Sequence, residues 1–260
     1  MGIGARVGRF CAYRSVLWEM SFKKLKAKYC GSFLGLWWAL ILPLFLAAAI
    51  NIVFSRVFKK DDPYFGLFLV SGLLPWFFFA NSINDALNSF TGNTSEARQN
   101  IFPREIMPLS FVGADFMNFM IGFVVVLPLF FVFAPRSIYL LPVLCALLFF
   151  FLLFCCGVCL FISCLNVFFR DLTHIMSVGM MVWFWLTPVF YPVSRFDDGF
   201  YKLIFLNPLV PYITSFQKIL YKGVMPQFTE ISACFILSVL SFGLGYLYFL
   251  KNETELLKRL

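Results

Sequence analysis

The stretch LSFVGADFMNFMIGFVVVLPLFFVFAPRSIYLLPVLCALLFFFLLFCCGVCLFISCL (residues 109–165) decides the fold. It contains two long apolar segments, Leu109–Ala134 and Ile138–Leu165, interrupted only by Pro135-Arg136-Ser137. A helix needs about 20 residues to cross the hydrocarbon core of a bilayer, and each segment reaches that length. Because three residues leave room only for a tight turn, the stretch predicts two antiparallel membrane-spanning helices.

The composition extends this membrane prediction to the rest of the chain. Of the 260 residues, 61% are hydrophobic and only 13% are charged, and the mean hydropathy is +0.86. Soluble domains carry about a quarter charged residues, which excludes a globular cytosolic protein. The net charge of +8 is typical of basic flanks that face anionic membrane lipid and set orientation. It therefore implies no nucleic-acid partner.

Four further apolar segments lie outside this hairpin and bring the predicted number of spans to six. They are Phe33–Phe54, Tyr64–Ile83, Ile175–Val193 and Ile231–Leu250. Lys and Arg number thirteen on the side of the N-terminal flank and eight on the other side, and this excess predicts that both ends are cytoplasmic. The predicted fold class is an all-α integral membrane protein with six transmembrane helices, N-in and C-in. The predicted domains are a basic amphipathic segment (residues 1–32), a six-span domain (residues 33–250) and a short cytoplasmic tail (residues 251–260).

The N-terminal segment is basic and partly amphipathic. Apolar residues recur at helical spacing and predict a helix over residues 10–20 that lies in the membrane interface. The apolar stripe fails at Lys24 and Lys28, which predicts a break or a second short helix before Gly31. Two interpretations remain open: a topology signal that anchors the chain on lipid, or an entry surface for an anionic lipid-linked substrate. The residues of that entry surface would be Lys23, Lys24, Lys26 and Lys28.

Residues 194–230 contain two apolar segments that are too short to cross a bilayer. These are Phe200–Leu206 and Leu209–Leu220, separated by Asn207-Pro208. Apolar helices of this length are typical of re-entrant or interfacial positions. Irregular backbone at membrane depth survives only where it is buried in protein or lines water. The region therefore predicts short re-entrant helices between the fifth and sixth spans, beside a translocation path.

No catalytic residue and no metal site can be assembled from this sequence. The chain has a single histidine, His174, and the apolar cysteines Cys155, Cys156 and Cys159 have no histidine companion; packing explains them. There is also no GxxxxGK[ST] phosphate loop. The chain is therefore expected to be no enzyme and to bind no cofactor, and any ATP and Mg²⁺ would be held by a separate partner subunit.

Polar and aromatic residues in the spans are the candidates for a channel or substrate path. Asp115 is the one ionisable residue clearly inside a predicted span, and ionisable residues at that depth are functional hypotheses by default. Close helix packing with polar contacts remains the alternative explanation. The candidate path residues are Trp37, Trp38, Asn81, Asp115, Asn118, Phe190 and Tyr191.

Five strings in the chain form an ordered set of four motifs, the third of which has two parts. They are KAKYCGSFLGLWWALILPLF (Lys26–Phe45), SGLLPWFFFANSI (Ser71–Ile83), NVFFRDLTHI (Asn166–Ile175) with WFWLTPVFYP (Trp183–Pro192), and NPLVPYI (Asn207–Ile213). This set resembles the ABC-2 type permeases, and more narrowly the exporters of O-antigen, teichoic acid and capsular polysaccharide. In the first string, the family pattern falls on Ser32, Leu34, Gly35, Trp38, Ala39 and Pro43. Cys30 departs from the charged or small polar residue that the family often has there.

The resemblance implies a homodimer in the bacterial plasma membrane, paired with two copies of an ABC ATPase subunit. It also implies a lipid-linked polysaccharide as the substrate, moved from the cytoplasmic leaflet outwards. Two alternatives stay open: an ABC-2 permease for drugs or small lipids, and a passive channel or structural membrane protein.

An external ATPase needs a contact on the cytoplasmic face. The polar segment RQNIFPREIMPLS (Arg98–Ser110), between the second and third spans, is the main candidate. Pro103 and Pro108 bracket four residues, which predicts at most a short helix of about one turn. The predicted coupling residues, including those of the loop after the fourth span, are Phe102, Pro103, Arg104, Glu105, Arg170 and Asp171.

Overall fold

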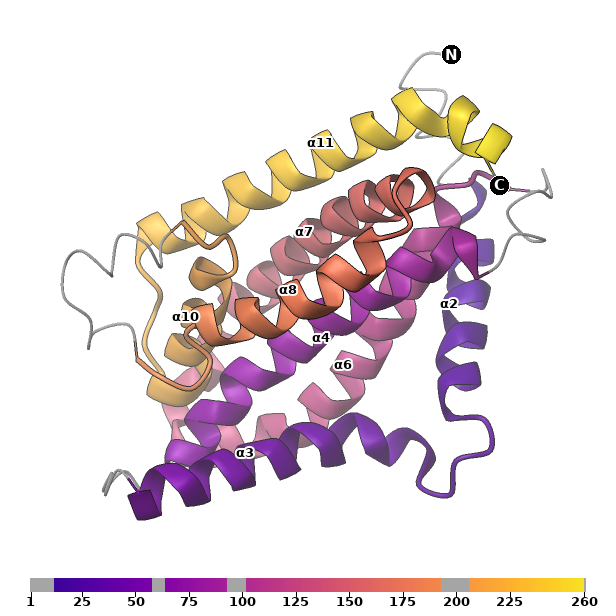
Figure 1. Cartoon of the computed structure of the whole chain (residues 1–260). Coiled ribbons are helices and arrows are strands. Elements are labelled where there is room, and N and C mark those ends of the chain that lie inside the picture. Colours follow the sequence, from indigo (N-terminus) through magenta and orange to yellow (C-terminus); the bar gives the residue numbers. More distant parts are fainter. Residues whose placement is uncertain (1–11, 58–63, 93–101, 193–205, 260) are drawn as a thin grey trace.

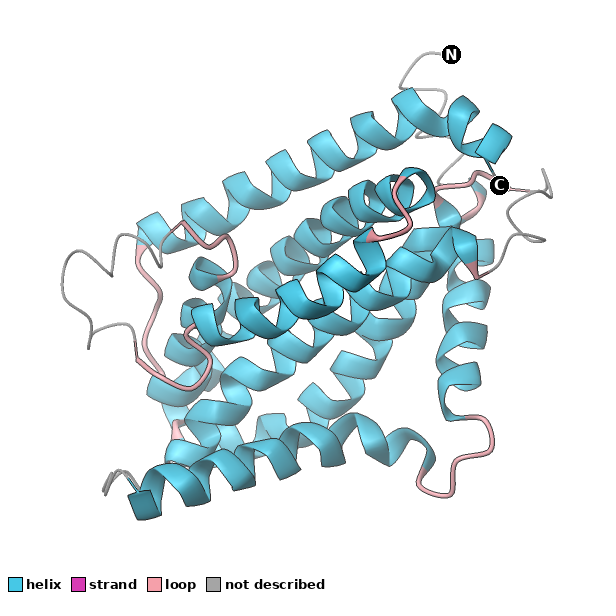
Figure 2. Cartoon of the chain, viewed as in Figure 1, coloured by secondary structure: helices cyan, strands magenta, loops and turns pink. Residues whose placement is uncertain are grey.

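The computed structural model describes residues 12–57, 64–92, 102–192 and 206–259. The regular elements of these residues are all helices (Figure 2). Four are long and apolar enough to cross a membrane: α4 (Phe65–Thr91), α6 (Ile106–Phe133), α7 (Leu141–Phe168), which continues a 3₁₀ turn η2 (Pro135–Leu140), and α11 (Phe228–Arg259). This confirms an all-helical, multi-pass membrane protein.

Two shorter apolar helices correspond to the first and fifth predicted spans. They are α3 (Trp38–Val57), of which Leu40–Ile50 is the apolar part, and α8 (Leu172–Leu186). Helix α8 has 15 residues, a length of about 22 Å. It ends before the predicted Val193 because Thr187 is extended and precedes Pro188, and a residue before proline avoids the helical conformation.

Helices α6 and α7 both lie against α4 (Figure 1). In that view α11 lies along α7, whereas α3 lies against α4 and α6 at the opposite side. Aromatic rings hold the centre of the bundle: the ring of Phe78 on α4 lies 5.4 Å from Phe119 of α6 and 5.5 Å from Phe151 of α7. The neighbouring ring of Phe79 lies 5.3 Å from Trp183 of α8. Consecutive residues of α4 thus face different neighbours.

Helices α7 and α11 approach each other through small residues. A Cβ atom on Gly245 would lie 2.0 Å from the carbonyl oxygen of Gly157, and one on Gly157 would lie 2.3 Å from the backbone of Ser241. Ser241 Oγ donates to the carbonyl of Phe154 at 3.0 Å, and Ser238 Oγ donates to that of Phe150 at 2.7 Å. Small residues at such contacts let two backbones pack closely inside a membrane.

The predicted break in the N-terminal helix is wrong. Helix α2 (Arg14–Tyr29) continues through both lysines, and the chain turns only at Gly31, whose φ is 79°. The polar positions face α6: Lys24 Nζ lies 3.5 Å from the ring centroid of Phe111. A Cβ atom on Gly113 would lie 2.4 Å from Ser21 Oγ, so the two helices are in close contact. The apolar stripe is interrupted where α2 meets polar and aromatic partners, and the helix itself continues.

The segment before the third span also differs from its prediction. Helix α6 begins at Ile106 and contains Pro108, so this proline does not close a separate short helix. Proline is tolerated in the first turn of a helix, where its missing N–H has no partner to lose. The amide of Ile106 donates to the carbonyl of Pro103, and that of Met107 to the carbonyl of Arg104. The turn at Pro103 therefore runs directly into α6.

A short helix is present where Leu209–Leu220 predicted one. Helix α10 (Val210–Gln217) continues into a π-helical turn η4 (Lys218–Lys222), and every residue of α10 is buried. The hydroxyl oxygen of Tyr212 lies 2.7 Å from Ser238 Oγ of α11. The same tyrosine hydroxyl also donates a hydrogen bond to the carbonyl of Cys234. Of the other predicted segment, Phe200–Leu206, only Leu206 is among the residues that the structure describes.

A small core lies at the end of the bundle where the described chain both begins and ends. Its buried residues come from the ends of α4, α7 and α11 and from the beginning of α6, and Leu17 of α2 packs against them. They are Phe90, Met107, Leu109, Leu160, Cys164, Val167, Phe249 and Leu256. Residues 251–259, predicted as a tail, continue α11 into this core.

Candidate functional site

Lys28 lies between carboxylates of two membrane-spanning helices. Its Nζ is 2.6 Å from Asp85 Oδ2 of α4 and also pairs with Asp115 Oδ1 of α6. The adjacent hydroxyl of Tyr29 donates to Asn118 Oδ1. We call Lys28, Asp85 and Asp115 the charge cluster. It joins α2, α4 and α6 at one point.

The charge cluster is mostly removed from solvent. The side chain of Asp115 is 1% exposed and that of Lys28 is 28% exposed. Burial opposes the ammonium form of Lys28, but the carboxylates of Asp115 and then Asp85 outweigh it and raise the pKa of Lys28. A lysine that two carboxylates already neutralise is a poor receptor for a phosphate group. The charge cluster therefore holds α2 against α4 and α6 by electrostatic attraction.

The four predicted entry lysines do not form one site. Lys23 and Lys26 are exposed, whereas Lys24 lies over Phe111 and Lys28 belongs to the charge cluster. Residues three or four apart lie on the same face of a helix, so Lys24 and Lys28 share the face toward α6 and Lys23 and Lys26 share another. Only the exposed pair keeps the geometry expected of a surface for an anionic headgroup.

The seven candidate path residues are spread over three places. Asp115 is part of the charge cluster, and Asn118 lies next to it, paired with Tyr29. The half-buried Asn81 precedes Asp85 by one helical turn on α4. Trp37 and Trp38, at the beginning of α3, are 63% and 45% exposed. The structure thus brings Asp115, Asn118 and Asn81 near one end of the bundle and leaves the tryptophans apart from them.

Phe190 and Tyr191 belong to an aromatic group just after α8. The ring of Phe190 lies 4.8 Å from Tyr191 and 4.9 Å from Trp185. Asn207, three residues before α10, connects this region to α8: its Oδ1 accepts a hydrogen bond from Trp183 Nε1 at 2.9 Å. These rings meet edge to face, and the place of Phe190 and Tyr191 in a substrate path stays a prediction.

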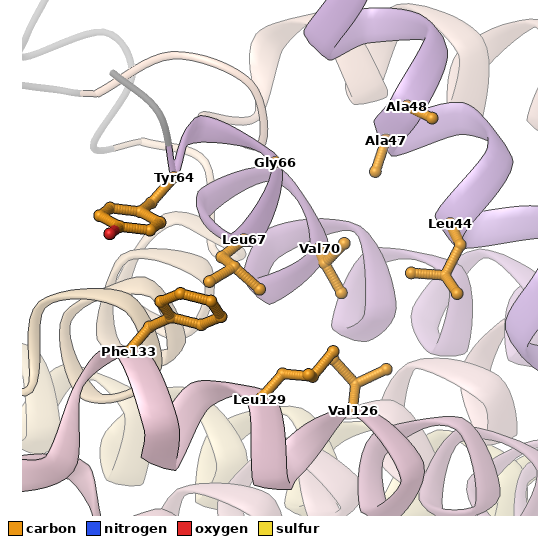
Figure 3. A pocket seen from close by; sticks show the side chains of 10 residues that line it. All are labelled: Leu44, Ala47, Ala48, Tyr64, Gly66, Leu67, Val70, Val126, Leu129 and Phe133. Atoms are coloured by element: carbon orange, nitrogen blue, oxygen red, sulfur yellow. The ribbon is translucent and has the colours of Figure 1, made fainter.

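An apolar groove of about 410 Å³ lies between α3, α4 and α6 (Figure 3). Tyr64 and Phe133, with ring centroids 4.9 Å apart, place it at the end of these helices opposite the charge cluster. It is lined by Leu44, Ala47, Ala48, Tyr64, Gly66, Leu67, Val70, Val126, Leu129 and Phe133. None of the predicted path residues is among them. This lining suits hydrocarbon and offers a glycan few hydrogen bonds.

The predicted coupling residues lie at the small core. Phe102 packs against it, Pro103 begins the turn into α6, and Glu105 is 6% exposed. Arg104 Nη1 lies 3.4 Å from Glu253 Oε1 of α11.

Arg170 and Asp171 are exposed at the corner between α7 and α8. Residues 98–101 of the predicted segment fall outside the described residues.

Sequence reasoning missed Asn166, which fixes that corner. Its Nδ2 donates to the carbonyl of Leu87 on α4 at 2.7 Å, and its Oδ1 accepts from Thr173 Oγ1 of α8 at 3.1 Å. The signal was present, since a lone amide near the end of an apolar helix needs partners. Asp85 was not predicted as a site residue, because its pairing with Lys28 joins residues far apart in sequence. Glu253 gave no signal beyond an ordinary charged position.

Comparison with known proteins supplies the remaining evidence. The family model described as ABC-2 type transporter matches residues 15–221. An O-antigen export system permease protein RfbA of Klebsiella pneumoniae is 32% identical over 218 residues, which covers 82% of this chain and 83% of the relative. The protein of the same name from Myxococcus xanthus is 31% identical over 232 residues, or 87% and 88% of the two chains.

Proposed function

The chain belongs to the ABC-2 type transporter family, and from that premise we propose that it is the membrane-spanning permease of an ATP-driven exporter of lipid-linked polysaccharide. The observation that carries this proposal is the similarity to two O-antigen export permeases along more than four fifths of the chain. The proposed location is the bacterial plasma membrane. ATP and Mg²⁺ would be held by a partner ABC ATPase, since this sequence has no phosphate loop.

The proposed topology has six spans with both ends in the cytoplasm. The four long helices, with α3 and α8, supply six apolar helices in the predicted order. The beginning of α2 and the end of α11 meet at the small core, which supports an even number of crossings. We propose that α10 is re-entrant. The functional unit would be a homodimer with two ATPase subunits.

The mechanism follows from where the polar groups lie. The ATPase would press on Phe102–Glu105 and on Arg170 and Asp171, at the same end as the small core. The exposed Lys23 and Lys26 would meet the diphosphate of the lipid carrier, while the charge cluster holds α2 in place. The glycan would then pass the polar residues near Asp115 and reach the aromatic group at Phe190 and Tyr191.

Loss of the chain should abolish surface polysaccharide. A deletion strain is expected to lack the surface glycan and to retain its lipid-linked form inside the cell, because transfer across the membrane is blocked. Surface glycan analysis and extraction of lipid-linked intermediates measure both. Restoration should require this chain together with its ATPase. Accumulation of a drug or small lipid with normal surface glycan would favour the alternative substrate class, and function without any ATPase would favour a passive channel.

The double variant Lys23→Ala/Lys26→Ala should weaken export without affecting folding. Each basic residue near an anionic lipid surface contributes about 1 kcal/mol of attraction, and both side chains are exposed. The measurement is surface glycan at matched expression. The control is Lys258→Ala, an exposed lysine of α11, which should export normally. Unchanged export by the double variant would remove the entry surface from the mechanism. Alanine at all four lysines is a poorer test, because it also breaks the charge cluster.

A further inference from the structure

The end of α11 contacts one segment that is proposed to meet the ATPase and lies beside the other. Glu253 of α11 pairs with Arg104, in the turn before α6. Six residues further on, the guanidinium of Arg259 lies 4.9 Å from the ring centroid of Phe168, at the corner before α8. One helix end thus joins two segments that are more than sixty residues apart in sequence.

This helix end is firmly held. The ring of Phe249 stacks on Phe90 of α4 at 6.0 Å between centroids, and Leu256 is fully buried in the small core. Apolar burial of this kind fixes the helix to α4, α6 and α7. Glu253 lies on the stretch between these two anchors, so its position is defined by the core and not by solvent.

The two contacts differ in strength. The side chains of Arg104 and Glu253 are 14% and 22% exposed, so their pairing is screened less than that of a surface ion pair. Arg259 is 52% exposed, and its ion pair with Glu255 at 3.7 Å lies on the surface. The Arg104–Glu253 pair is therefore a partly buried polar link between the turn before α6 and α11.

Helix α11 reaches from this link to the far end of the bundle. It has 32 residues, a length of about 48 Å. Near its other end Ser238 meets Tyr212 of α10, and Lys218 Nζ of η4 lies 2.7 Å from Glu230 Oε1. A displacement of the turn before α6 is thus connected, through one continuous helix, to the short buried helix at the opposite end.

We propose that Glu253 is a positioning residue of the transporter, which transmits movement of the ATPase-facing turn to α11 through Arg104 and so to α10. The proposal rests on the proposed function, because it assumes that an ATPase moves that turn. Glu253 acts through Arg104 and contacts neither nucleotide nor glycan. Coupling of this kind travels through packed side chains and rigid helices.

The test separates ATP hydrolysis from export. Glu253→Gln keeps the size of the side chain and removes the charge that pairs with Arg104. We expect the complex with the ATPase to form and to hydrolyse ATP in proteoliposomes of bacterial lipid, while surface glycan in cells falls roughly fivefold or more, the range of a typical coupling between sites. Glu255→Gln is the matched control, because Glu255 is 58% exposed on the same helix; it should behave as wild type.

Two further variants keep the test decisive. Glu253→Asp retains the charge and should recover export in part, and the exchange Arg104→Glu/Glu253→Arg should export better than Glu253→Gln. Normal export by Glu253→Gln, or a loss of export only in proportion to lost complex, would overturn the positioning role. Failure of the wild-type chain to export with any ATPase would instead overturn the proposed function.

Discussion

Replacing Lys28 with methionine is expected to destabilise the protein by about 3 kcal/mol, since removal of one partner of a buried ion pair leaves an uncompensated charge. The carboxylates of Asp85 and Asp115 are both left without Lys28, and Asp115 is the more buried of the two, with 1% of its side chain exposed against 29% for Asp85. Methionine preserves most of the volume of the lysine chain, so the loss reports on charge more than on packing. The measurement is thermal unfolding of the purified protein in detergent, together with surface glycan in cells.

Two controls separate the charge effect from a general effect on α2. Lys26→Met changes an exposed lysine two positions earlier and should leave the unfolding temperature unchanged. The double variant Lys28→Met/Asp115→Asn should recover much of the lost stability, because a buried amide costs less than an unpaired buried carboxylate. A Lys28→Met protein as stable as wild type would show that the charge cluster does not anchor α2.

Gly245→Ala should separate α7 from α11 and prevent normal assembly of the bundle. The added methyl group would lie 2.0 Å from the carbonyl oxygen of Gly157, a backbone atom that cannot move aside without shifting its helix. Overpacking of this kind costs about 1–3 kcal/mol and occasionally more, and we expect the upper end of that range. The measurement is the yield of folded protein and its unfolding temperature in detergent.

The matched control lies two residues earlier on the same helix. A Cβ atom on Gly243 would meet nothing within 4 Å, so Gly243→Ala should be neutral or slightly stabilising, since alanine favours a helix more than glycine does. Equal stability of the two variants would contradict the close approach of α7 and α11.

The membrane character of the protein was predictable because it depends on the composition of long segments. Six apolar stretches and the scarcity of charge define an all-helical membrane protein whatever the details of packing, and the structure confirms four of the long helices. The short helix at Val210–Gln217 was predictable for the same reason, because its length and flanking prolines are local properties. The motifs also indicated the family correctly before any comparison.

Pairings between distant residues were not predictable. Lys28 was grouped with its sequence neighbours as a surface cation, although its partners are 57 and 87 positions away at Asp85 and Asp115. The same limit explains the predicted break in α2, since an interrupted apolar stripe looks like a helix end until the polar partners on α6 are known. Glu253 is a further case: nothing near it in sequence indicates Arg104.

The sequence by itself therefore determined that this protein lies in a lipid membrane, and it also determined the approximate extent of most helices and the family. These depend on transfer of whole segments from water to lipid, and that free energy is a sum over neighbouring residues. Only the tertiary structure decided which lysines remain exposed, which carboxylates hold α2, and that the end of α11 contacts both the turn before α6 and the end of α7. Inside a membrane a buried charge needs a partner at contact distance, and the packing of the helices alone decides which residue that partner is.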